Sequence, residues 1–300
     1  MVFRAGLIAF YLFFAGAAFA QGKIVVHDDL GNSLCLSGPA TKVISLYAGH
    51  SETLLAMGYG DRLVAVSQSD DGELFPGIPR LPRNFDPESI IALNPDLIIS
   101  RPMLEGTHGR ALDVLRRTGI PVVNLDPPVW TSLFDYVRTI GELLGDRGDV
   151  QVDLLARSIE RLSIMAEIRR AGSKKPVFFL ETGEKGIRTC SPDSWAAGII
   201  ELAGGVNGAS DASPLREGSP LAPYGMERLI GITPTLDVYI VQQGAMNDVT
   251  EKSVYERPWI EILRGKRILF IDERDLSRPS VYRMESTVRQ LTDFFFPEDL

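Results

Sequence analysis

The sequence predicts an α/β protein built from two Rossmann-like lobes, each with a central parallel sheet, joined by a single long helix. Short apolar runs alternate with helical patterns at close range in both halves of the 300-residue chain, which is typical of parallel sheets with crossover helices. Between the halves, one helical pattern continues for about 22 residues, or about 33 Å at 1.5 Å per residue. We therefore divide the chain into a signal peptide, an N-terminal lobe, a linker helix and a C-terminal lobe, at residues 1–20, 21–146, 147–172 and 173–300.

The first twenty residues predict export from the cytoplasm. Arg4 precedes an apolar run that ends at Phe14, and the small residues that follow finish as Ala18-Phe19-Ala20, an A-x-A cleavage site. The apolar run is shorter than the ~20 residues that a membrane-spanning helix needs. No cysteine stands at the cleavage point to accept a lipid. We expect a cleaved, soluble protein in the periplasm.

Composition excludes several classes of partner. The formal net charge of −8 argues against nucleic acid and against an anionic membrane surface. The two cysteines, Cys35 and Cys190, are too few for a disulfide scaffold. They lie in different predicted lobes, so we expect two unpaired thiols.

The N-terminal lobe begins with a predicted β-hairpin, because residues 22–38 contain two alternating runs around a turn. Strands and helices then alternate as buried apolar runs and amphipathic stretches. The expected strands are 42–48, 62–67, 95–100 and 120–125, and the expected helices are 51–58, 86–93, 109–119 and 130–145.

A long helical linker follows, and the second half then repeats this organisation. Residues 150–168 carry one apolar stripe at helical spacing, made by Val150, Leu154, Leu155, Ile159, Leu162, Met165 and Ile168. The C-terminal lobe then restarts with a strand at 176–181, a helix at 194–205 and a helix followed by a strand at 225–241. Glu88 precedes Pro95 by seven positions, and Glu227 precedes Pro234 by seven. In each pair the glutamate opens a short helix and the proline introduces a strand, which favours two similarly built lobes.

The segment GHSET at 49–53 differs by one residue from the nucleophile elbow G-x-S-x-G of α/β hydrolases. A serine nucleophile in that fold needs a later histidine, and only His108 follows Ser51. Thr53 also adds a side chain where the elbow needs glycine. A secreted serine hydrolase using Ser51 is therefore an alternative with little support, and Ser51 is expected to cap the helix that it opens.

A metal site is the second alternative. The chain has three histidines, at positions 27, 50 and 108, and His50 and His108 could join Glu52 in a site. No H-x-H or H-x-x-x-H spacing supports a free transition-metal carrier. A single axial ligand to a metal already held in a macrocycle needs just one imidazole, and His50 is the candidate.

Cationic and aromatic side chains follow several predicted strands. Arg101 comes directly after one strand, at the edge where parallel sheets bind ligands. Other arginines of the second half stand after strands or in loops, where they would suit carboxylates or phosphates. Flat apolar contact could come from Tyr47, Trp195 and Tyr282. The arginines of the second half that stand after strands or in loops are Arg188, Arg278 and Arg283.

Three segments resemble one protein family. KVISLYAGHSETLLAMGYGDRLVAVS (42–67), DPESIIALNPDLIIS (86–100) and ELAGGVN (201–207) are similar to class III periplasmic substrate-binding proteins, which serve ABC importers of cobalamin, haem and ferric siderophores. The resemblance runs from about residue 23 to the C-terminus and is hardly specific for the ligand. It implies two lobes bridged by one helix, a ligand held between them with little hinge closure, and no catalysis. It also implies that Glu88 and Glu227 dock onto arginines of an inner-membrane permease.

The sequence departs from the family pattern at the loop YAGH and at Arg101, where an aromatic residue is common. This departure favours a subgroup that holds its cargo with Tyr47, His50 and Arg101. We expect a monomeric carrier of a metal chelate, with a corrinoid preferred over a ferric siderophore or haem, and no intrinsic cofactor. The expected ligand-binding residues are Tyr47, His50, Arg101, Arg188, Trp195, Arg278 and Tyr282, with His50 as a possible axial ligand to the chelated metal.

Overall fold

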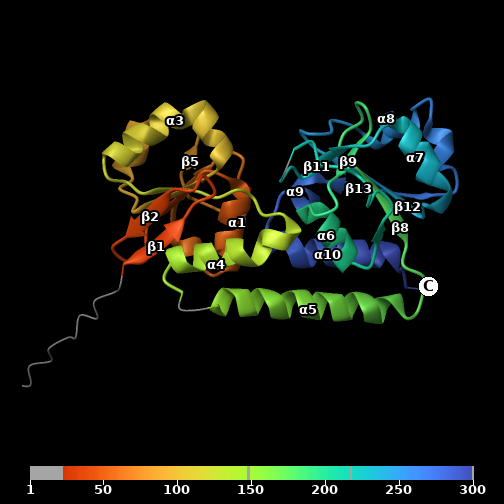
Figure 1. The fold of residues 1–300 in the computed structure, drawn as a ribbon, viewed down its shortest axis with the longest axis horizontal. Coiled ribbons are helices and arrows are strands. Elements are labelled where there is room, and N and C mark those ends of the chain that lie inside the picture. Colours follow the sequence, from red (N-terminus) through yellow and green to blue (C-terminus); the bar gives the residue numbers. More distant parts are fainter. Residues whose placement is uncertain (1–22, 147–148, 217, 299–300) are drawn as a thin grey trace, which may run out of the picture.

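The computed structural model describes residues 23–146, 149–216 and 218–298. The predicted signal peptide at 1–20 lies outside these residues. They form two α/β lobes side by side, and one long helix runs beneath both (Figure 1). The predicted fold class is confirmed. In the described part of the chain, no helix is both long and apolar enough to cross a membrane.

The N-terminal lobe contains a five-stranded parallel sheet in the order β5-β4-β3-β6-β7. The predicted hairpin precedes it as a separate antiparallel pair, β1 with β2. Strands β3 and β6 are fully buried, because helices cover both faces of the sheet. The strands are β1 (Ile24–His27), β2 (Ser33–Leu36), β3 (Val43–Ser45), β4 (Leu63–Ser67), β5 (Arg80–Leu81), β6 (Leu97–Ser100) and β7 (Val122–Asn124).

Two helices of this lobe begin earlier than the sequence predicts. The first starts at Ala48 with Tyr47 as its N-cap, so Ser51 lies inside the helix and the predicted capping role of Ser51 was wrong. The third starts at Pro102, directly after Arg101. The helical elements are α1 (Ala48–Ala56), η1 (Gly60–Arg62), α2 (Pro87–Ala92), α3 (Pro102–Arg117), η2 (Trp130–Ser132) and α4 (Leu133–Leu143).

Helix α5 (Val150–Arg170) lies within the segment predicted as the linker and has 21 residues. Its buried positions, Leu155, Leu162 and Ala166, pack toward α4 and α10. The predicted stripe is narrower than expected, because Val150, Leu154 and Ile168 are exposed to solvent. The helix ends where Ala171 adopts a left-handed conformation with φ of 49°.

The C-terminal lobe has a four-stranded parallel sheet in the order β10-β8-β12-β13, with a small antiparallel pair, β9 and β11, beside it. Its strands are β8 (Val177–Glu181), β9 (Arg188–Cys190), β10 (Val206–Asn207), β11 (Leu221–Pro223), β12 (Val238–Gln243) and β13 (Arg267–Asp272). Its helical elements are α6 (Trp195–Leu202), α7 (Met226–Ile232), η3 (Thr233–Thr235), α8 (Glu251–Tyr255), η4 (Ile260–Leu263), α9 (Glu273–Leu276) and α10 (Val281–Phe295).

The two lobes share one apolar core on the side that faces α5. A single cluster of buried side chains runs from the N-terminal sheet through α4, α5, α6 and α10 to the C-terminal sheet. Two smaller clusters fill the outer layers of the two lobes. Cys35 is exposed and Cys190 is buried, and the two thiols are not bonded to each other. The lobes are therefore packed against each other as well as tethered by α5.

Candidate functional site

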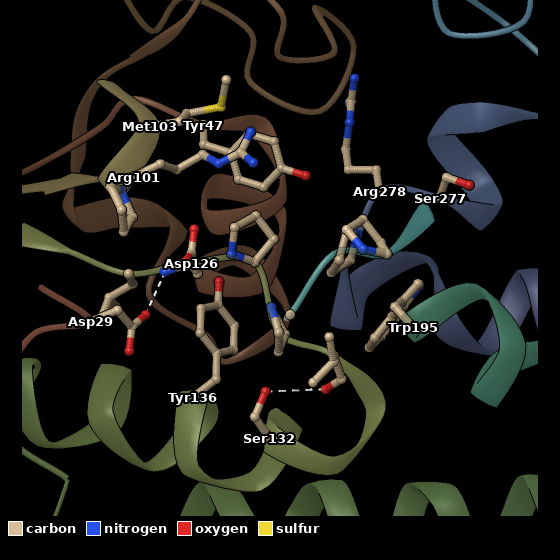
Figure 2. A pocket seen from close by; sticks show the side chains of 18 of the residues that line it. Asp29, Tyr47, Arg101, Met103, Asp126, Ser132, Tyr136, Trp195, Ser277 and Arg278 are labelled. Atoms are coloured by element: carbon tan, nitrogen blue, oxygen red, sulfur yellow. Dashed lines mark hydrogen bonds between the residues drawn. The ribbon is translucent and has the colours of Figure 1, made fainter. Parts of the chain in front are cut away.

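A cleft of about 950 Å³ lies between the lobes and is lined by residues of both (Figure 2). The N-terminal lobe contributes the loops that follow β3, β6 and β7 and one side of α4. The C-terminal lobe contributes the start of α6, the loop before β11 and the segment 277–279 after α9. The carboxyl ends of parallel strands open onto this space, which is where such sheets bind ligands. We call it the interlobe cleft.

Tyr47 and Arg101 form one wall of the interlobe cleft because both stand just past the carboxyl end of a central strand, β3 and β6. The Arg101 guanidinium lies over the Tyr47 ring, with its central carbon 4.4 Å from the ring centroid. This cation–π contact holds both side chains in place. The Nε atom of Arg101 is buried, and among the described residues it has no hydrogen-bond partner. That N–H is out of reach of solvent, and Arg101 meets the cleft with the rest of its side chain.

Asp29 and Asp126 add acidic groups to the same wall. The Asp29 carboxylate accepts a hydrogen bond of 2.5 Å from the backbone N–H of Asp126 (Figure 2). Burial, with the nearby charge of Asp126, raises the pKa of Asp29 above its ordinary value. This pair is not predicted from the sequence, because the turn of the hairpin that carries Asp29 belongs to no strand of the main sheet.

Trp195 and Arg278 face these residues from the C-terminal lobe. Trp195 is the first residue of α6, which Ser194 caps by accepting a hydrogen bond from the backbone N–H of Ala197. The Trp195 indole N–H is buried, and the described part of the chain gives it no acceptor. Arg278 follows α9 and is mostly buried, with 16% of its side chain exposed. This wall therefore contributes an aromatic side chain and the Arg278 guanidinium to the cleft.

His50 is not among the residues that line the interlobe cleft, so the structure gives no support to the prediction that it contacts the cargo. It is fully buried in α1, and its Nδ1 lies 2.7 Å from the Tyr136 hydroxyl. Its Nε2 lies 3.1 Å from the Leu125 carbonyl oxygen, so Nε2 donates and Nδ1 accepts. Burial, with the charge of Arg101, lowers the pKa of His50 to about 3. A neutral imidazole with both nitrogens bonded fixes Tyr136, which lines the cleft, and has no lone pair left for a metal.

Two further predicted residues do not line the interlobe cleft. Arg188 begins β9 and is exposed, with its aliphatic carbons against Gly183. Tyr282 stands on the first turn of α10 and is 44% exposed. The structure thus brings together Tyr47, Arg101, Trp195 and Arg278 from the predicted set and leaves His50, Arg188 and Tyr282 outside.

The arrangement around Ser51 differs from that of a serine hydrolase. The Ser51 hydroxyl is buried and donates to the Ser45 hydroxyl at 2.8 Å. His50 is engaged elsewhere, His27 bonds Ser33, and His108 stacks on Phe85 with ring centroids 5.1 Å apart. In the described ranges, no three His, Cys, Asp or Glu side chains are grouped so that they could hold a metal ion.

Comparison with known proteins identifies the family. The family model described as periplasmic binding protein matches residues 43–251. A vitamin B12-binding protein of Vibrio parahaemolyticus is 23% identical over 259 residues, which cover 85% of this chain and 90% of that protein.

Solved structures share the fold. A possible iron-binding periplasmic protein of Staphylococcus epidermidis has a TM-score of 0.69 at 23% identity, covering 85% of this chain and 98% of that one. The periplasmic haem-binding protein RhuT of Roseiflexus sp. RS-1 has a TM-score of 0.59 at 22% identity, covering 86% and 98%. Members of the family are the substrate-binding components of ABC transporters and work with inner-membrane permeases. The chain belongs to the periplasmic binding protein family, in the class III group with two lobes joined by one long helix.

Proposed function

We propose that this protein captures a metal chelate, with a corrinoid as the first candidate, in the interlobe cleft and delivers it to an inner-membrane permease. The observation that carries the proposal is the size and make-up of the cleft. Its volume of about 950 Å³ stands near the upper end of the ~300–1,000 Å³ usual for small-molecule sites. Aromatic side chains on both walls, Tyr47 and Tyr136 on one and Trp195 on the other, suit a large flat ligand.

The charges of the cleft favour a corrinoid over haem or an anionic siderophore. Its lining includes three guanidinium groups, of Arg101, Arg216 and Arg278, and four carboxylates, of Asp29, Asp126, Asp135 and Glu273. A corrinoid carries amide groups around its ring, and amides both donate to carboxylates and accept from guanidinium groups. A cargo with several carboxylates of its own would meet like charges on the same walls. The vitamin B12-binding relative supports the same choice.

In this proposal the protein supplies no ligand to the chelated metal, which keeps the ligands that it has within the chelate. His50 was the sequence-based candidate for an axial ligand, and its ring nitrogens are both occupied inside α1. The protein would then recognise the periphery and the flat faces of the cargo. This recognition suits a carrier that must release its cargo intact.

Binding is tested by thermal shift and absorbance titration with cyanocobalamin, haemin, a ferric catecholate and a ferric hydroxamate. We expect cyanocobalamin to stabilise the wild-type protein, and Trp195→Ala to weaken that binding by about tenfold or more. Tyr282→Ala is the matched aromatic control, because it is exposed and lies outside the cleft. A protein that none of the four chelates stabilises, or equal losses in the two variants, would refute the proposal.

Glu88 and Glu227 are proposed to dock the loaded carrier on the permease. Both are exposed in the first turns of short helices, α2 and α7. Helix α2 packs on α3, and Figure 1 shows α3 and α7 on the side of the lobes away from α5. Two separated carboxylates on one side can orient the carrier and speed its encounter with a basic surface.

The docking proposal is tested by replacing Glu88 and Glu227 together with alanine. Uptake of the chelate in cells should be abolished, whereas affinity of the purified protein for the chelate should be unchanged. Glu160→Ala on the exposed face of α5 is the control for loss of acidic charge and should leave uptake intact. Loss of chelate affinity in the double variant would contradict the assigned role.

A further inference from the structure

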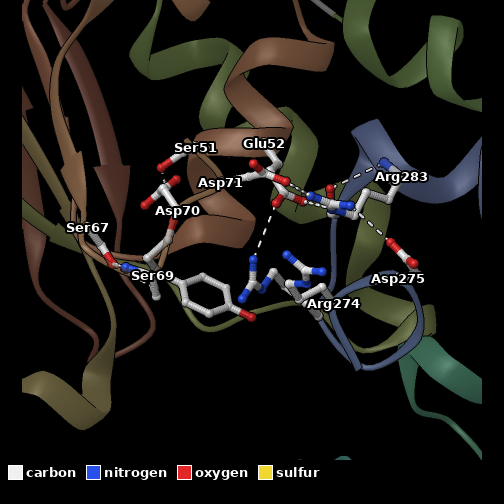
Figure 3. Close-up of polar contacts among 12 residues, drawn as sticks. Ser51, Glu52, Ser67, Ser69, Asp70, Asp71, Arg274, Asp275 and Arg283 are labelled. Carbon is white, nitrogen blue, oxygen red and sulfur yellow. Dashed lines mark hydrogen bonds and ion pairs between the residues drawn. The ribbon is translucent and has the colours of Figure 1, made fainter. Parts of the chain in front are cut away.

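A buried carboxylate joins the two lobes beside the interlobe cleft (Figure 3). Glu52 lies in α1 of the N-terminal lobe and is fully buried. Two arginines of the C-terminal lobe, Arg278 and Arg283, reach across to its two oxygens. We call these three residues the Glu52 junction. Because a buried carboxylate is costly unless it is paired, at least one of the two guanidinium groups must stay with it.

The two arginines are held very unequally. Arg283 donates from Nε to Glu52 at 2.9 Å, from Nη1 to Asp275 at 3.0 Å and from Nη2 to Asp71 at 3.2 Å. Burial lowers the pKa of Arg283, but Glu52 and Asp275 outweigh burial and raise it well above its ordinary value. Arg278 has a single contact with Glu52, a long one of 3.4 Å from Nη1 to Oε1. Arg283 is therefore fixed, whereas Arg278 is loosely held.

Arg278 is also the member of the junction that lines the interlobe cleft, together with its neighbours Ser277 and Pro279. Arg283 and Glu52 are not among the lining residues. The junction thus has one arginine dedicated to the buried charge and a second arginine placed between that charge and the cargo space. If Arg283 were absent, Arg278 would be the guanidinium left beside Glu52, and the low dielectric around a buried carboxylate would strengthen their pairing.

We propose that Arg283 is a positioning residue for cargo binding: by neutralising Glu52 it releases Arg278 to donate hydrogen bonds to an oxygen acceptor on the cargo. Such an acceptor is an amide carbonyl, a carboxylate or a phosphate. Glu52 stays paired with Arg283 in both the empty and the loaded protein, so Arg278 can move away without leaving a buried carboxylate unpaired. This inference rests on the proposed capture of a chelate in the cleft.

The test is a set of variants titrated with cyanocobalamin. Arg283→Met should weaken binding by about tenfold or more, although Arg283 does not line the cleft, because Glu52 then captures Arg278. Adding Glu52→Gln should restore affinity to within about threefold of wild type, since no buried charge remains to hold Arg278. Glu52→Gln alone should bind at least as well as wild type. A purely structural role for Arg283 predicts no rescue, and absence of rescue would overturn the proposal.

A second measurement needs no cargo. Phenylglyoxal modifies free guanidinium groups faster than ion-paired ones, and peptide mass spectrometry gives the rate at Arg278. Without ligand, Arg283→Met should slow labelling of Arg278 several-fold relative to wild type, and the Glu52→Gln double variant should recover it. Equal labelling rates in all three proteins would overturn the inference. If wild type binds none of the chelates, the proposed function fails, while the labelling still decides the role of Arg283.

Should Arg283→Met fail to fold, Asp275→Asn supplies a milder change. It removes one of the three carboxylates that fix Arg283, so that the Arg283 guanidinium is less firmly held beside Glu52 and neutralises it less completely. A less firmly held Arg283 should lower cyanocobalamin affinity and slow labelling of Arg278 in the same direction, by a smaller factor. No change in either quantity would count against the proposal.

Discussion

Replacement of Gly198 by alanine should destabilise this protein, although the same change stabilises most helices. Gly198 lies in α6, against the indole of Trp130 from the other lobe. An added methyl carbon would stand 2.5 Å from Cε3 of that indole and closer still to Cγ and Cδ2. Carbon atoms normally approach to about 3.5–4.0 Å, so the contact is too short by at least about 1 Å.

The indole has little room to move away. The backbone N–H of Trp130 donates to the Asp193 carbonyl at 2.9 Å, and its ring packs on Trp195 with centroids 6.0 Å apart. Overpacking of this kind typically costs about 1–3 kcal/mol. The gain in helix propensity from glycine to alanine is about 1 kcal/mol. We expect a net loss of up to about 2 kcal/mol in the free energy of unfolding, together with weaker cyanocobalamin binding, because Trp195 would shift.

Urea denaturation of Gly198→Ala and of Gly106→Ala separates the two effects. Gly106 also lies inside a helix, α3, but a methyl group there would meet no atom within 4 Å. That control should gain about 0.5–1 kcal/mol from helix propensity alone. If both variants were stabilised alike, the contact between Trp130 and α6 would not exist in solution, and the packing of the lobes described above would be wrong.

Three further changes test other parts of the structure. Gly49→Ala would bring a methyl carbon within 2.5 Å of the Pro279 carbonyl oxygen across the lobes, so we expect a loss of about 1–3 kcal/mol in urea denaturation; unchanged stability would show that the lobes do not touch there. Arg257→Met would leave the fully buried Glu181 carboxylate without the guanidinium group that contacts it at 2.6 and 2.9 Å. This change should lower the free energy of unfolding by about 3–5 kcal/mol, and adding Glu181→Gln should recover most of that loss. Burial raises the pKa of Asp70 to about 6, so the folded state takes up this proton more readily than the unfolded chain. The free energy of unfolding should therefore fall by up to ~3 kcal/mol as pH rises from about 4 to 6, and Asp70→Asn should flatten that slope.

Much of the fold follows from local pattern, because a parallel strand buried on both faces must be a continuous apolar run. Strands β3, β6, β8 and β12 are of this kind and are predicted by the sequence. The pair β9 and β11 is not, since each has three residues and is held by its partner more than by its own composition. The early start of α3 was also missed, because Gly106, Thr107 and Gly109 lower helix propensity over its first turns.

The candidate site was only partly predictable. Tyr47 and Arg101 follow central strands, so strand order alone places them at the cleft. His50 follows the same strand as Tyr47, but α1 begins at Ala48 and turns the imidazole into the core. Asp29 reaches the cleft from the hairpin, and no local signal in the sequence says where that hairpin packs. Arg188 was misplaced because β9 belongs to the small antiparallel sheet and not to the central one.

Three contacts between the lobes limit how this protein can respond to its cargo. The shared apolar cluster, the close approach of Trp130 to Gly198 and the buried charge of Glu52 all lie between the lobes. A hinge that opened the lobes widely would expose apolar surface and separate Glu52 from Arg283, and either change alone costs several kcal/mol. Cargo must therefore enter a cleft that is largely formed in advance, and the shape of the cleft sets its selectivity for cargo. Adjustment is left to side chains at the edge, and Arg278, held by one long contact to Glu52, is a charged group that is free to make it.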